Sequence, residues 1–586
     1  MAVFAFTASA VEVASGTCGE SLTWVLTDDG TLTITGSGAM NDYEYSNIFD
    51  NVNNPWYNHR NTIQSIVLAA DIVTIGNYAF YDCTNLTSIT LPNGLASVGD
   101  YAFYNCSSLT SITLSESITS IGDYAFRSCS NLSFIALPEG LTTVGSGAFA
   151  FCFSLTEICV DADNPFFCNI DGVLFNKSKT ILIAYPAGKS STSYTVPSGV
   201  TTIGAYAFAS CTKLSSIPLP KELTTINEYA FYNCSGMPAI TLPEGITTIG
   251  DHAFDCCKKL ASIVLPKGLS TIGECAYASC SNLTSIALPD GFTSISNYAF
   301  YNCTNLTSIT FPKGLVAIGD YAFRFCKSLT SISLPEGLTS IGNYAFDYCS
   351  NLTSVTLPKG LTSIGQYAFF NCTKLTSITL PEGLTSIGND AFAGCNKLTS
   401  VTLPEGLTSI GTFVFASCTN LTTITIPASV TEICRYAFRN CSNLLDVYYG
   451  GTESDWAKIN IDSCDNEALL NANLYFTIKE TYQLLSLVLK DNNGKKLDTI
   501  PTDTFYAEAK VEKLQETEPA LIMLVSYDKN GQMLSTSYLY ADVPVGIPYM
   551  LASQINNISG KVGEVKAFVL SSPGNPVPLT KAISVK

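Results

Sequence analysis

Apolar and polar residues alternate along a short unit that recurs through most of the chain. In residues 329–351, LTSISLPEGLTSIGNYAFDYCSN, the stretch TSISL turns Ile332 and Leu334 to one side and Ser331 and Ser333 to the other. A period of two predicts a short β-strand with its apolar side inward. The proline that follows ends the strand, because proline lacks the amide that a strand ladder needs.

The rest of the unit predicts a second extended piece and a turn. TSIG supplies the extended piece, and Gly342 permits a tight bend. NYAFDYC predicts about one helical turn that directs Phe346 into the interior. The apolar positions that recur in register are Leu329, Ile332, Leu334, Leu338, Ile341, Ala345, Phe346 and Cys349. One unit cannot bury so many, so the pattern predicts that successive units stack and share a core.

The aromatic residue of this unit returns every 23 residues. A first run holds Phe80, Phe103, Phe126 and Phe149, and a second holds Phe208, Phe231, Phe254, Tyr277, Phe300, Phe323, Phe346, Phe369, Phe392, Phe415 and Phe438. The runs are 59 residues apart, which is one step of 23 plus an insertion of 36. The sequence therefore predicts a mainly β solenoid of 15 coils, one of which carries the insertion.

A column of charged residues tests the stacking independently. The position after the proline alternates in sign over eight successive coils: Lys221, Glu244, Lys267, Asp290, Lys313, Glu336, Lys359 and Glu382. Parallel strands repeat at about 4.8 Å, so each charge would lie between two charges of opposite sign. Exposed pairs contribute only about 0.2 to 1 kcal/mol each, so we interpret the column as specifying register. Duplication of a two-coil unit would produce the same alternation.

The segments LxxIxLP and IGxYAFxxC, repeated every 23 residues, resemble the leucine-rich repeats of BspA-like bacterial surface proteins, the Treponema-type subclass. Residues 18–43 and 54–57 resemble the N-terminal cap of that family, and residues 160–186 resemble its inserted hairpin coil. Residues 447–461 resemble its C-terminal cap, in which Trp456 would plug the open core. The resemblance implies a secreted or cell-surface, adhesin-like protein whose relatives attach to host proteins or neighbouring cells.

The repeat stops at about residue 479. ALIMLVSYD and QMLSTSYLYA, joined by Lys529-Asn530-Gly531, predict a β-hairpin, and Asn492-Asn493-Gly494 predicts another turn. Together with VKAFVL (565–570), these strands predict a β-sandwich. The predicted parts are a signal peptide remnant (1–10), an N-terminal cap (11–61), the leucine-rich repeat solenoid (62–446) with its inserted hairpin coil at about 159–195, a C-terminal cap (447–478) and the sandwich module (479–586).

Composition and charge argue against several functions. The 30 basic and 48 acidic residues give a net charge of −18, and no basic stripe is present, so we expect no nucleic-acid partner. No apolar run reaches the roughly 18 residues of a membrane helix. The two histidines, His59 and His252, lie far apart, which argues against a histidine metal cluster or a Ser-His-Asp triad. With no phosphate loop or GxSxG elbow, we expect no enzyme activity, cofactor or metal.

The first residues indicate export. MAVFAFTASA ends a short apolar run with Ala8-Ser9-Ala10, the small-x-small pattern that signal peptidase reads. The run lacks a positively charged start, so an ordinary edge strand remains the alternative. We expect an extracellular protein, secreted or at the cell surface, and find no sorting motif that would tell how it attaches.

Fifteen of the 22 cysteines follow the aromatic residue by three positions, from Cys83 to Cys441. Parallel side chains in one column keep their Cβ atoms slightly too far apart for disulfides, so we expect reduced, inward thiols. A line of ligands is also unsuitable for a tetrahedral metal. Among the other seven, Cys159 and Cys168 form the favoured candidate pair.

Two other features have structural interpretations. Asp161-Ala162-Asp163-Asn164 resembles a calcium loop but lacks its glycine and distal glutamate, so we interpret it as a turn before Pro165. His252 replaces a tyrosine of the repeat, and His59 lies in the cap, so both are expected to be structural.

Two repeated surfaces are candidate binding sites. The strand face carries small hydroxyls at Ser308, Thr310, Ser331, Ser333, Ser354, Thr356, Ser377, Thr379, Ser400 and Thr402. The second surface is a column of tyrosines, Tyr298, Tyr321, Tyr344 and Tyr367, with Tyr301 and Phe370 nearby. Hydroxyls suit broad contact with proteins or glycans, and aromatic residues suit protein or sugar interfaces. Simple solvation of a strand and capping of the turns are the structural alternatives.

These features predict a monomeric, nonenzymatic protein that binds proteins or glycans through a long repetitive surface and gains avidity from repetition. The alternative is a spacer that binds nothing and presents another module. Ice binding is disfavoured, because Phe134, Ala136 and Pro218 interrupt the hydroxyl lattice.

Overall fold

A computed structural model describes residues 10–46, 51–476, 482–501, 503–513, 520–530, 532–541, 549–557, 561–570 and 583–585. The chain divides into two compact units. The first contains the chain up to Ile424 with Glu432–Leu445 and Asn460–Ala472, and the second contains Thr425–Thr431, Asp446–Ile459 and the chain from Asn473. Most of the expected signal peptide lies outside the described residues. No helix among the described residues is long and apolar enough to cross a membrane.

The first unit begins with an antiparallel sheet that continues into the solenoid. β1 (Glu12–Gly19) pairs with β2 (Leu22–Thr27), and β2 pairs with β3 (Thr31–Gly36). β3 then runs parallel to β7 (Ser65–Leu68), which pairs with β9 (Ser88–Thr90). The remaining cap elements are β4 (Gly38–Ala39), β5 (Tyr45–Ser46), β6 (Asn51–Val52) and the 3-10 helix η1 (Tyr57–His59). The cap therefore supplies a partner for the first strand of the stack.

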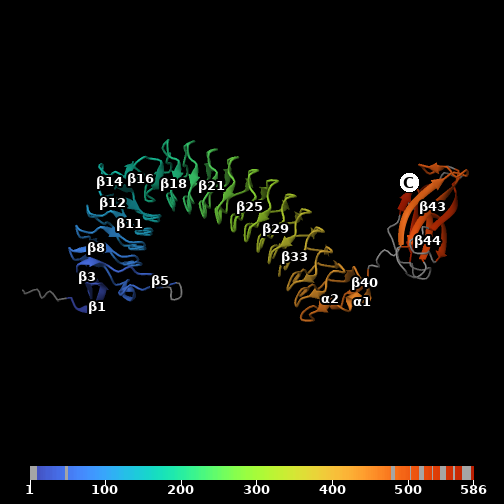
Figure 1. Cartoon of the computed structure of the whole chain (residues 1–586), viewed down its shortest axis with the longest axis horizontal. Helices are drawn as coiled ribbons and strands as arrows, with labels where there is room; N and C mark the ends of the chain where they lie inside the picture. Colours follow the sequence, from blue (N-terminus) through green and yellow to red (C-terminus); the bar gives the residue numbers. More distant parts are fainter. Residues whose placement is uncertain are drawn as a thin grey trace, which may run out of the picture. The chain divides into compact units, whose positions relative to one another are not determined.

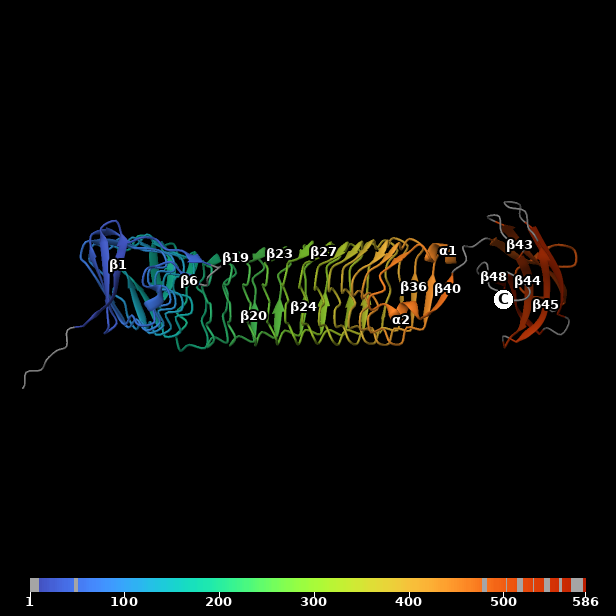
Figure 2. The same cartoon turned by 90° about the horizontal axis from the view of Figure 1, so that it is seen from below.

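Each coil contributes up to two short strands, which form two separate parallel rows (Figures 1 and 2). The first row contains β12 (Phe134–Leu137), β14 (Glu157–Val160), β20 (Ala239–Thr241), β22 (Ser262–Val264), β24 (Ser285–Ala287), β26 (Ser308–Thr310), β28 (Ser331–Ser333), β30 (Ser354–Thr356), β32 (Ser377–Ile378), β34 (Ser400–Thr402) and β36 (Thr423–Ile426). The second row contains β8 (Ile72–Ile75), β10 (Ser97–Val98), β11 (Ser120–Ile121), β13 (Thr143–Val144), β18 (Thr202–Ile203), β19 (Thr225–Ile226), β21 (Thr248–Ile249), β23 (Thr271–Ile272), β25 (Ser294–Ile295), β27 (Ala317–Ile318), β29 (Ser340–Ile341), β31 (Ser363–Ile364), β33 (Ser386–Ile387), β35 (Ser409–Ile410), β37 (Glu432–Ile433) and β39 (Asn460–Ile461).

The predicted alternation and register are confirmed in these strands. Ile332 and Leu334 are buried, whereas Ser331 and Ser333 are exposed. Ser331 pairs with Ser354 in the parallel register of β28 and β30, 23 residues further along the chain. The solenoid and its stacked core are therefore as the sequence predicts.

The predicted helical turn is wrong, because the amides of NYAFDYC bond to the next coil. Tyr344 and Tyr348 have φ values of 56°, in the left-handed region that a right-handed helix excludes. Three amides of this segment donate to carbonyls of the following coil: Tyr344 to Gln366, Phe346 to Ala368 and Tyr348 to Phe370, at 2.7 to 2.8 Å. A helix would use these amides within its own segment.

Phenylalanine rings and thiols form two inward ladders. Phe346 is fully buried, and its ring centroid lies 5.3 Å from that of Phe323 and 5.4 Å from that of Phe369. The thiol of Cys349 donates to the Phe323 carbonyl at 3.3 Å, and burial raises its pKa well above the usual value. All 22 cysteines are free, and the fifteen of the ladder are buried, which confirms their inward orientation. The candidate Cys159–Cys168 pair is not formed; instead the Cys168 thiol donates to the Asn176 carbonyl.

The insertion is a hairpin that returns to the frame of the solenoid. β15 (Phe167–Ile170), β16 (Val173–Asn176) and β17 (Ile181–Ala184) are antiparallel, and β17 then runs parallel to β18. Tyr185 stacks on Phe208, its counterpart 23 residues later, at 5.4 Å. The Asn164 side chain is buried and donates to the Pro138 and Leu141 carbonyls, which agrees with a structural role for the turn before Pro165.

The alternating charges do not close into ion pairs. Among the described residues, no member of the column lies within 4.0 Å of an opposite charge in a neighbouring coil. The backbone amide of Lys267 instead donates to the Glu244 carboxylate at 3.3 Å. These side chains extend into solvent, where water screens their attraction.

In the second unit, β38 (Asp446–Tyr449) pairs with β40 (Asn473–Phe476), and α1 (Glu453–Trp456) follows β38. Trp456 is not the buried plug that the resemblance implies. It remains half-exposed and packs edge-on against Tyr449, which is buried, at 5.2 Å. The short helix α2 (Glu467–Leu470) belongs to the first unit and buries Leu469.

The second unit also contains two antiparallel four-stranded sheets, in the orders β42-β41-β43-β46 and β45-β44-β47-β48. The strands are β41 (Tyr482–Lys490), β42 (Lys496–Leu497), β43 (Thr504–Lys513), β44 (Ala520–Asp528), β45 (Met533–Ala541), β46 (Tyr549–Asn556), β47 (Val562–Leu570) and β48 (Ile583–Val585). Their inward residues form one apolar cluster that includes Phe505 and Ile522. The predicted β44–β45 hairpin and the turn at Gly494 are confirmed, although Gly531 lies outside the described residues.

Candidate binding surfaces

The strand face of β26, β28, β30, β32 and β34 presents hydroxyls that make no hydrogen bond to other described residues of the protein. All ten predicted serines and threonines are exposed, and Thr379 lies immediately after β32. Within the described part of the chain, none of these ten side chains makes a hydrogen bond. Four of the five threonines that precede the strand serines behave differently; the Thr353 hydroxyl, for example, donates to the Thr330 carbonyl at 2.9 Å. The strand face therefore offers free donors and acceptors at the spacing of parallel strands.

Asparagine and aspartate side chains hold the coils in register on the turn side. The backbone amide of Asp320 donates to Asn297 Oδ1, that of Asn343 to Asp320 Oδ1 and that of Gln366 to Asn343 Oδ1, at 2.6 to 2.8 Å. Sequence reasoning missed this ladder, although an Asn or Asp before the tyrosine in coil after coil was the available signal. Fixed spacing of the coils also fixes the spacing of the hydroxyls.

The structure brings the predicted tyrosines together as a stack of parallel rings. The centroids of Tyr298, Tyr321, Tyr344 and Tyr367 are 4.5, 4.6 and 4.5 Å apart in turn, with planes within 7° of parallel. Each ring face is therefore covered by the next ring, and the edges and hydroxyls remain for a ligand. Burial raises the pKa of Tyr298, Tyr344 and Tyr367, so these hydroxyls stay protonated at neutral pH.

A second aromatic row beside the tyrosines was only partly foreseen. It contains Tyr301, Phe325, Tyr348 and Phe370, whose successive centroids are 5.1 to 5.8 Å apart. The guanidinium of Arg324 lies over the Phe325 ring, 4.6 Å from its centroid. The sequence indicated Tyr301 and Phe370. Phe325 and Tyr348 occupy a position whose residue type varies between coils, so no repeated aromatic pattern in the sequence indicated them.

An ion pair with a buried carboxylate lies beside this row. Arg324 Nε donates to Asp347 Oδ2 at 2.7 Å, and Asp347 is 1% exposed. Burial raises the pKa of Asp347 to about 6, although Arg324 opposes the shift. Asp347 Oδ1 has no hydrogen-bond partner among the described residues. The pair anchors the cation beside the aromatic row.

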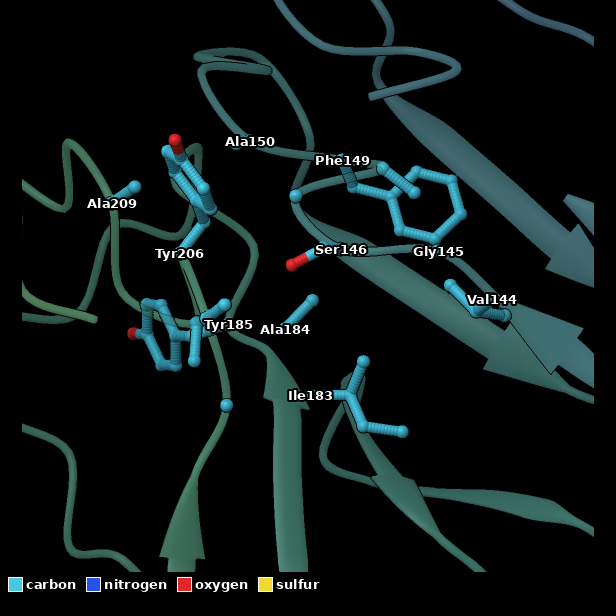
Figure 3. Close-up of a pocket in the computed structure, with 15 residues that line it drawn as sticks. Val144, Gly145, Ser146, Phe149, Ala150, Ile183, Ala184, Tyr185, Tyr206 and Ala209 are labelled. Atoms are coloured by element: carbon cyan, nitrogen blue, oxygen red, sulfur yellow. The ribbon is translucent and has the colours of Figure 1, made fainter. Parts of the chain in front are cut away.

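The hairpin coil interrupts the ladder of turn amides and leaves a small cavity. The amides of Gly147, Phe149 and Phe151, unlike their counterparts Tyr124, Phe126 and Ser128, make no hydrogen bond within the described part of the chain. The space beside Gly147 and Phe149 is about 90 Å³, with Tyr185 and Tyr206 across from Phe149 (Figure 3). Its size suits a few bridging water molecules, not a sizeable ligand.

Aromatic residues from the coils on either side of this cavity pack against each other. Tyr206 reaches across the space left by Gly147, and its ring lies edge-on to Tyr124 at 5.4 Å. The Arg127 guanidinium lies 5.3, 4.6 and 5.0 Å from the centroids of Tyr124, Phe151 and Tyr206. Arg127 therefore joins coils that are separated in sequence by the hairpin.

The first row of strands is also interrupted where Pro218 removes an amide. No strand forms over residues 215–219, and a hollow of about 440 Å³ opens there beside β20. Its lining includes Ser216, Pro218, Lys221 and Thr241. It is a second place on the strand side where a ligand group could enter.

No cluster of three or more histidine, cysteine, aspartate or glutamate side chains suited to a metal occurs among the described residues.

Comparison with protein families gives one match. A model described as the BspA type leucine rich repeat region, in 6 copies, matches residues 50–181, 184–303, 270–381 and 362–483. A search of curated proteins found no match.

Several solved structures are similar to parts of this chain. A leucine-rich repeat protein from Eubacterium ventriosum is 29% identical over 65% of this chain and 95% of its own, with a TM-score of 0.44. A leucine rich cell surface protein from Faecalibacterium prausnitzii is 24% identical over 78% of this chain and 99% of its own, with a TM-score of 0.32. A leucine rich repeat protein from T. pallidum is 31% identical over 27% of this chain and 77% of its own, with a TM-score of 0.26.

Proposed function

This chain belongs to the BspA type leucine rich repeat family, and on that premise we propose that it is a secreted or cell-surface, adhesin-like protein. It binds proteins or glycans of a host or neighbouring cell through the strand face of its solenoid. The proposal assigns no catalytic activity, cofactor or membrane-spanning part to the chain, and it treats the protein as a monomer.

The free hydroxyls of the strand face are the observation that supports binding there. A polar group that already has a protein partner must lose it before it meets a ligand, whereas Ser331 and Ser354 have only water to exchange. Serine and threonine also lose little side-chain entropy when they bind. A repeated row of such groups gives weak individual contacts that add through repetition.

The tyrosine column can contribute hydrogen bonds to a ligand through the exposed edges of its rings. Tyr321 and Tyr344 can donate hydrogen bonds from their hydroxyls, but their stacked rings leave no face for a sugar to pack on. We therefore place the principal surface on the strands and a supporting one on the tyrosines.

Export is supported by the small-x-small pattern at Ala8-Ser9-Ala10 and by the family. Within the chain we assign residues 11–61 and 447–478 to the caps, 62–446 to the solenoid and 479–586 to a β-sandwich module. The two antiparallel sheets and their shared core support the sandwich.

The alternative is a spacer that holds the sandwich module away from the cell. The separate apolar core of residues 484–585 favours this second function, because a module with its own core can be presented independently.

Binding of the full chain to arrays of matrix proteins and glycans tests the proposal. The variant Ser331→Arg/Ser354→Arg/Ser377→Arg places bulk and charge on the strand face. A matched control, Ser294→Arg/Ser386→Arg/Ser409→Arg, changes three exposed serines of the second row. We expect the first variant alone to weaken binding, by about tenfold or more. Equal losses in both variants would contradict the assigned face, and an array without any bound ligand would favour the spacer.

A further inference from the structure

Two consecutive coils replace the tyrosine of the turn with residues that can carry out chemistry. His252 and Cys275 follow Tyr229 in this column and precede Tyr298. The His252 ring stacks on Tyr229 with centroids 4.4 Å apart and planes 5° from parallel. The histidine therefore fits the ladder as a ring, as expected from the sequence, but it also brings two ring nitrogens.

An aspartate of the same turn orients this histidine. Nδ1 of His252 lies 3.0 Å from Asp255 Oδ2, and the Asp255 side chain is 15% exposed. The contact leaves Nε2 as the nitrogen available to another partner. Hydrogen bonding to Asp255 and then to Cys275 raises the pKa of His252 to about 10, so the ring is an imidazolium at neutral pH.

Cys275 is the next residue of the column. The backbone amide of His252 donates at 2.8 Å to the carbonyl of Glu274, the residue before Cys275. Tyrosine rings that occupy successive positions of this column lie 4.5 to 4.6 Å apart, so the thiol lies beside the imidazolium. Cysteines that lie beside a cationic side chain are in general more reactive toward disulfides than cysteines in apolar surroundings.

The ladder thiols lack this environment. Cys280 of the same coil is fully buried, donates to the Phe254 carbonyl and has a strongly raised pKa because of burial. Burial and then Asp255 raise the pKa of Cys256 to about 11. Cys275 is only half-buried and has a cation as its neighbour. Tyr229, Tyr298 and Glu274 are the other ionisable groups around the pair.

We propose that Cys275 is a reactive thiol that exchanges with external disulfides, with His252 as its cationic partner and Asp255 as the group that orients His252. The Cys275 sulfur attacks one sulfur of the disulfide, a new S–S bond forms and the old one breaks. The second sulfur leaves as a thiolate and takes a proton from His252 or solvent. The external disulfide is the oxidant, so the exchange needs no other reagent. This site is independent of the strand face.

Treatment of the full chain with glutathione disulfide tests the site, with each cysteine followed by peptide mass spectrometry. We expect Cys275 to be modified before Cys464, although Cys464 is the exposed cysteine. His252→Tyr restores the residue that the column carries elsewhere and keeps the stack, yet it should slow modification of Cys275 by about tenfold or more. His59→Gln, which changes the other histidine, should leave the rate unchanged.

Three outcomes would overturn the inference: earlier modification of Cys464, an unchanged rate at Cys275 in His252→Tyr, or an equal slowing in His59→Gln. Iodoacetamide gives a second readout that does not depend on the disulfide used. The same order of rates with this reagent would support an activated thiol, and the reverse order would contradict it.

Discussion

The indole of Trp56 stacks on the ring of Phe80, with centroids 5.7 Å apart and planes 18° from parallel. Trp56 is fully buried, and its Nε1 donates to the Ala79 carbonyl at 2.7 Å. A residue of the cap therefore provides the first ring of the phenylalanine ladder. The cap covers apolar side chains that an open coil would expose.

We predict that Trp56→Ala destabilises the first unit by about 3 to 5 kcal/mol, because it leaves a large cavity. It also leaves the Ala79 carbonyl without its partner. Urea unfolding followed by circular dichroism measures the loss. His59→Ala in the same cap is the control, and we expect it to cost less than about 1 kcal/mol. Similar costs for the two variants would mean that Trp56 does not close the stack.

Two aromatic residues of the same turn differ in burial, since Phe346 lies in the core and Tyr344 lies at the surface. Phe346→Ala should cost about 3 to 5 kcal/mol, because the ring is fully buried between two others. Tyr344→Ala removes a half-exposed ring and should be mild. Denaturant unfolding of both variants checks the difference. Equal effects would contradict the assigned orientation of the turn.

The buried carboxyl of Asp347 should make stability depend on pH. Its pKa is raised from the ordinary value to about 6, so the folded state holds the proton more tightly than the unfolded state. The stabilisation is complete below pH of about 4 and is lost as the pH rises through about 6. Asp347→Asn cannot titrate, so its unfolding free energy, measured between pH 4 and 7, should fall less with pH. Parallel pH profiles for the variant and the wild type would contradict the assignment.

Arg127 should stabilise the junction at the hairpin coil. Arg127→Ala removes the cation between Tyr124, Phe151 and Tyr206. The amides of residues 145–151 and 204–210 should then exchange hydrogen faster, as measured by mass spectrometry. Arg435→Ala, which removes an exposed arginine from a distant coil, is the control. Unchanged exchange at the junction in Arg127→Ala would show that the rings hold it without the cation.

The features that could be predicted from the sequence are those that one repeated pattern encodes. The strand at Ser331–Ser333 and the inward ring of Phe346 follow from local alternation and from the 23-residue step. The turn after Gly342 was misread as helical, because its amides bond to a coil 23 residues away that no local propensity reports. In the candidate surfaces, the hydroxyls were predictable from their column. The Arg324–Asp347 pair was not, because both residues occupy a position whose residue type varies from coil to coil.

The stacking of one coil on the next is tested most directly by a double-mutant cycle between Phe346 and Phe369. Their centroids are 5.4 Å apart, so Phe346→Leu and Phe369→Leu should show a coupling free energy of about 0.5 to 1.5 kcal/mol in urea unfolding. The same cycle between Phe346 and Phe415, three coils apart, should give a coupling below about 0.5 kcal/mol. Equal coupling in the two cycles, or none in the first, would contradict a ladder of rings that runs from coil to coil.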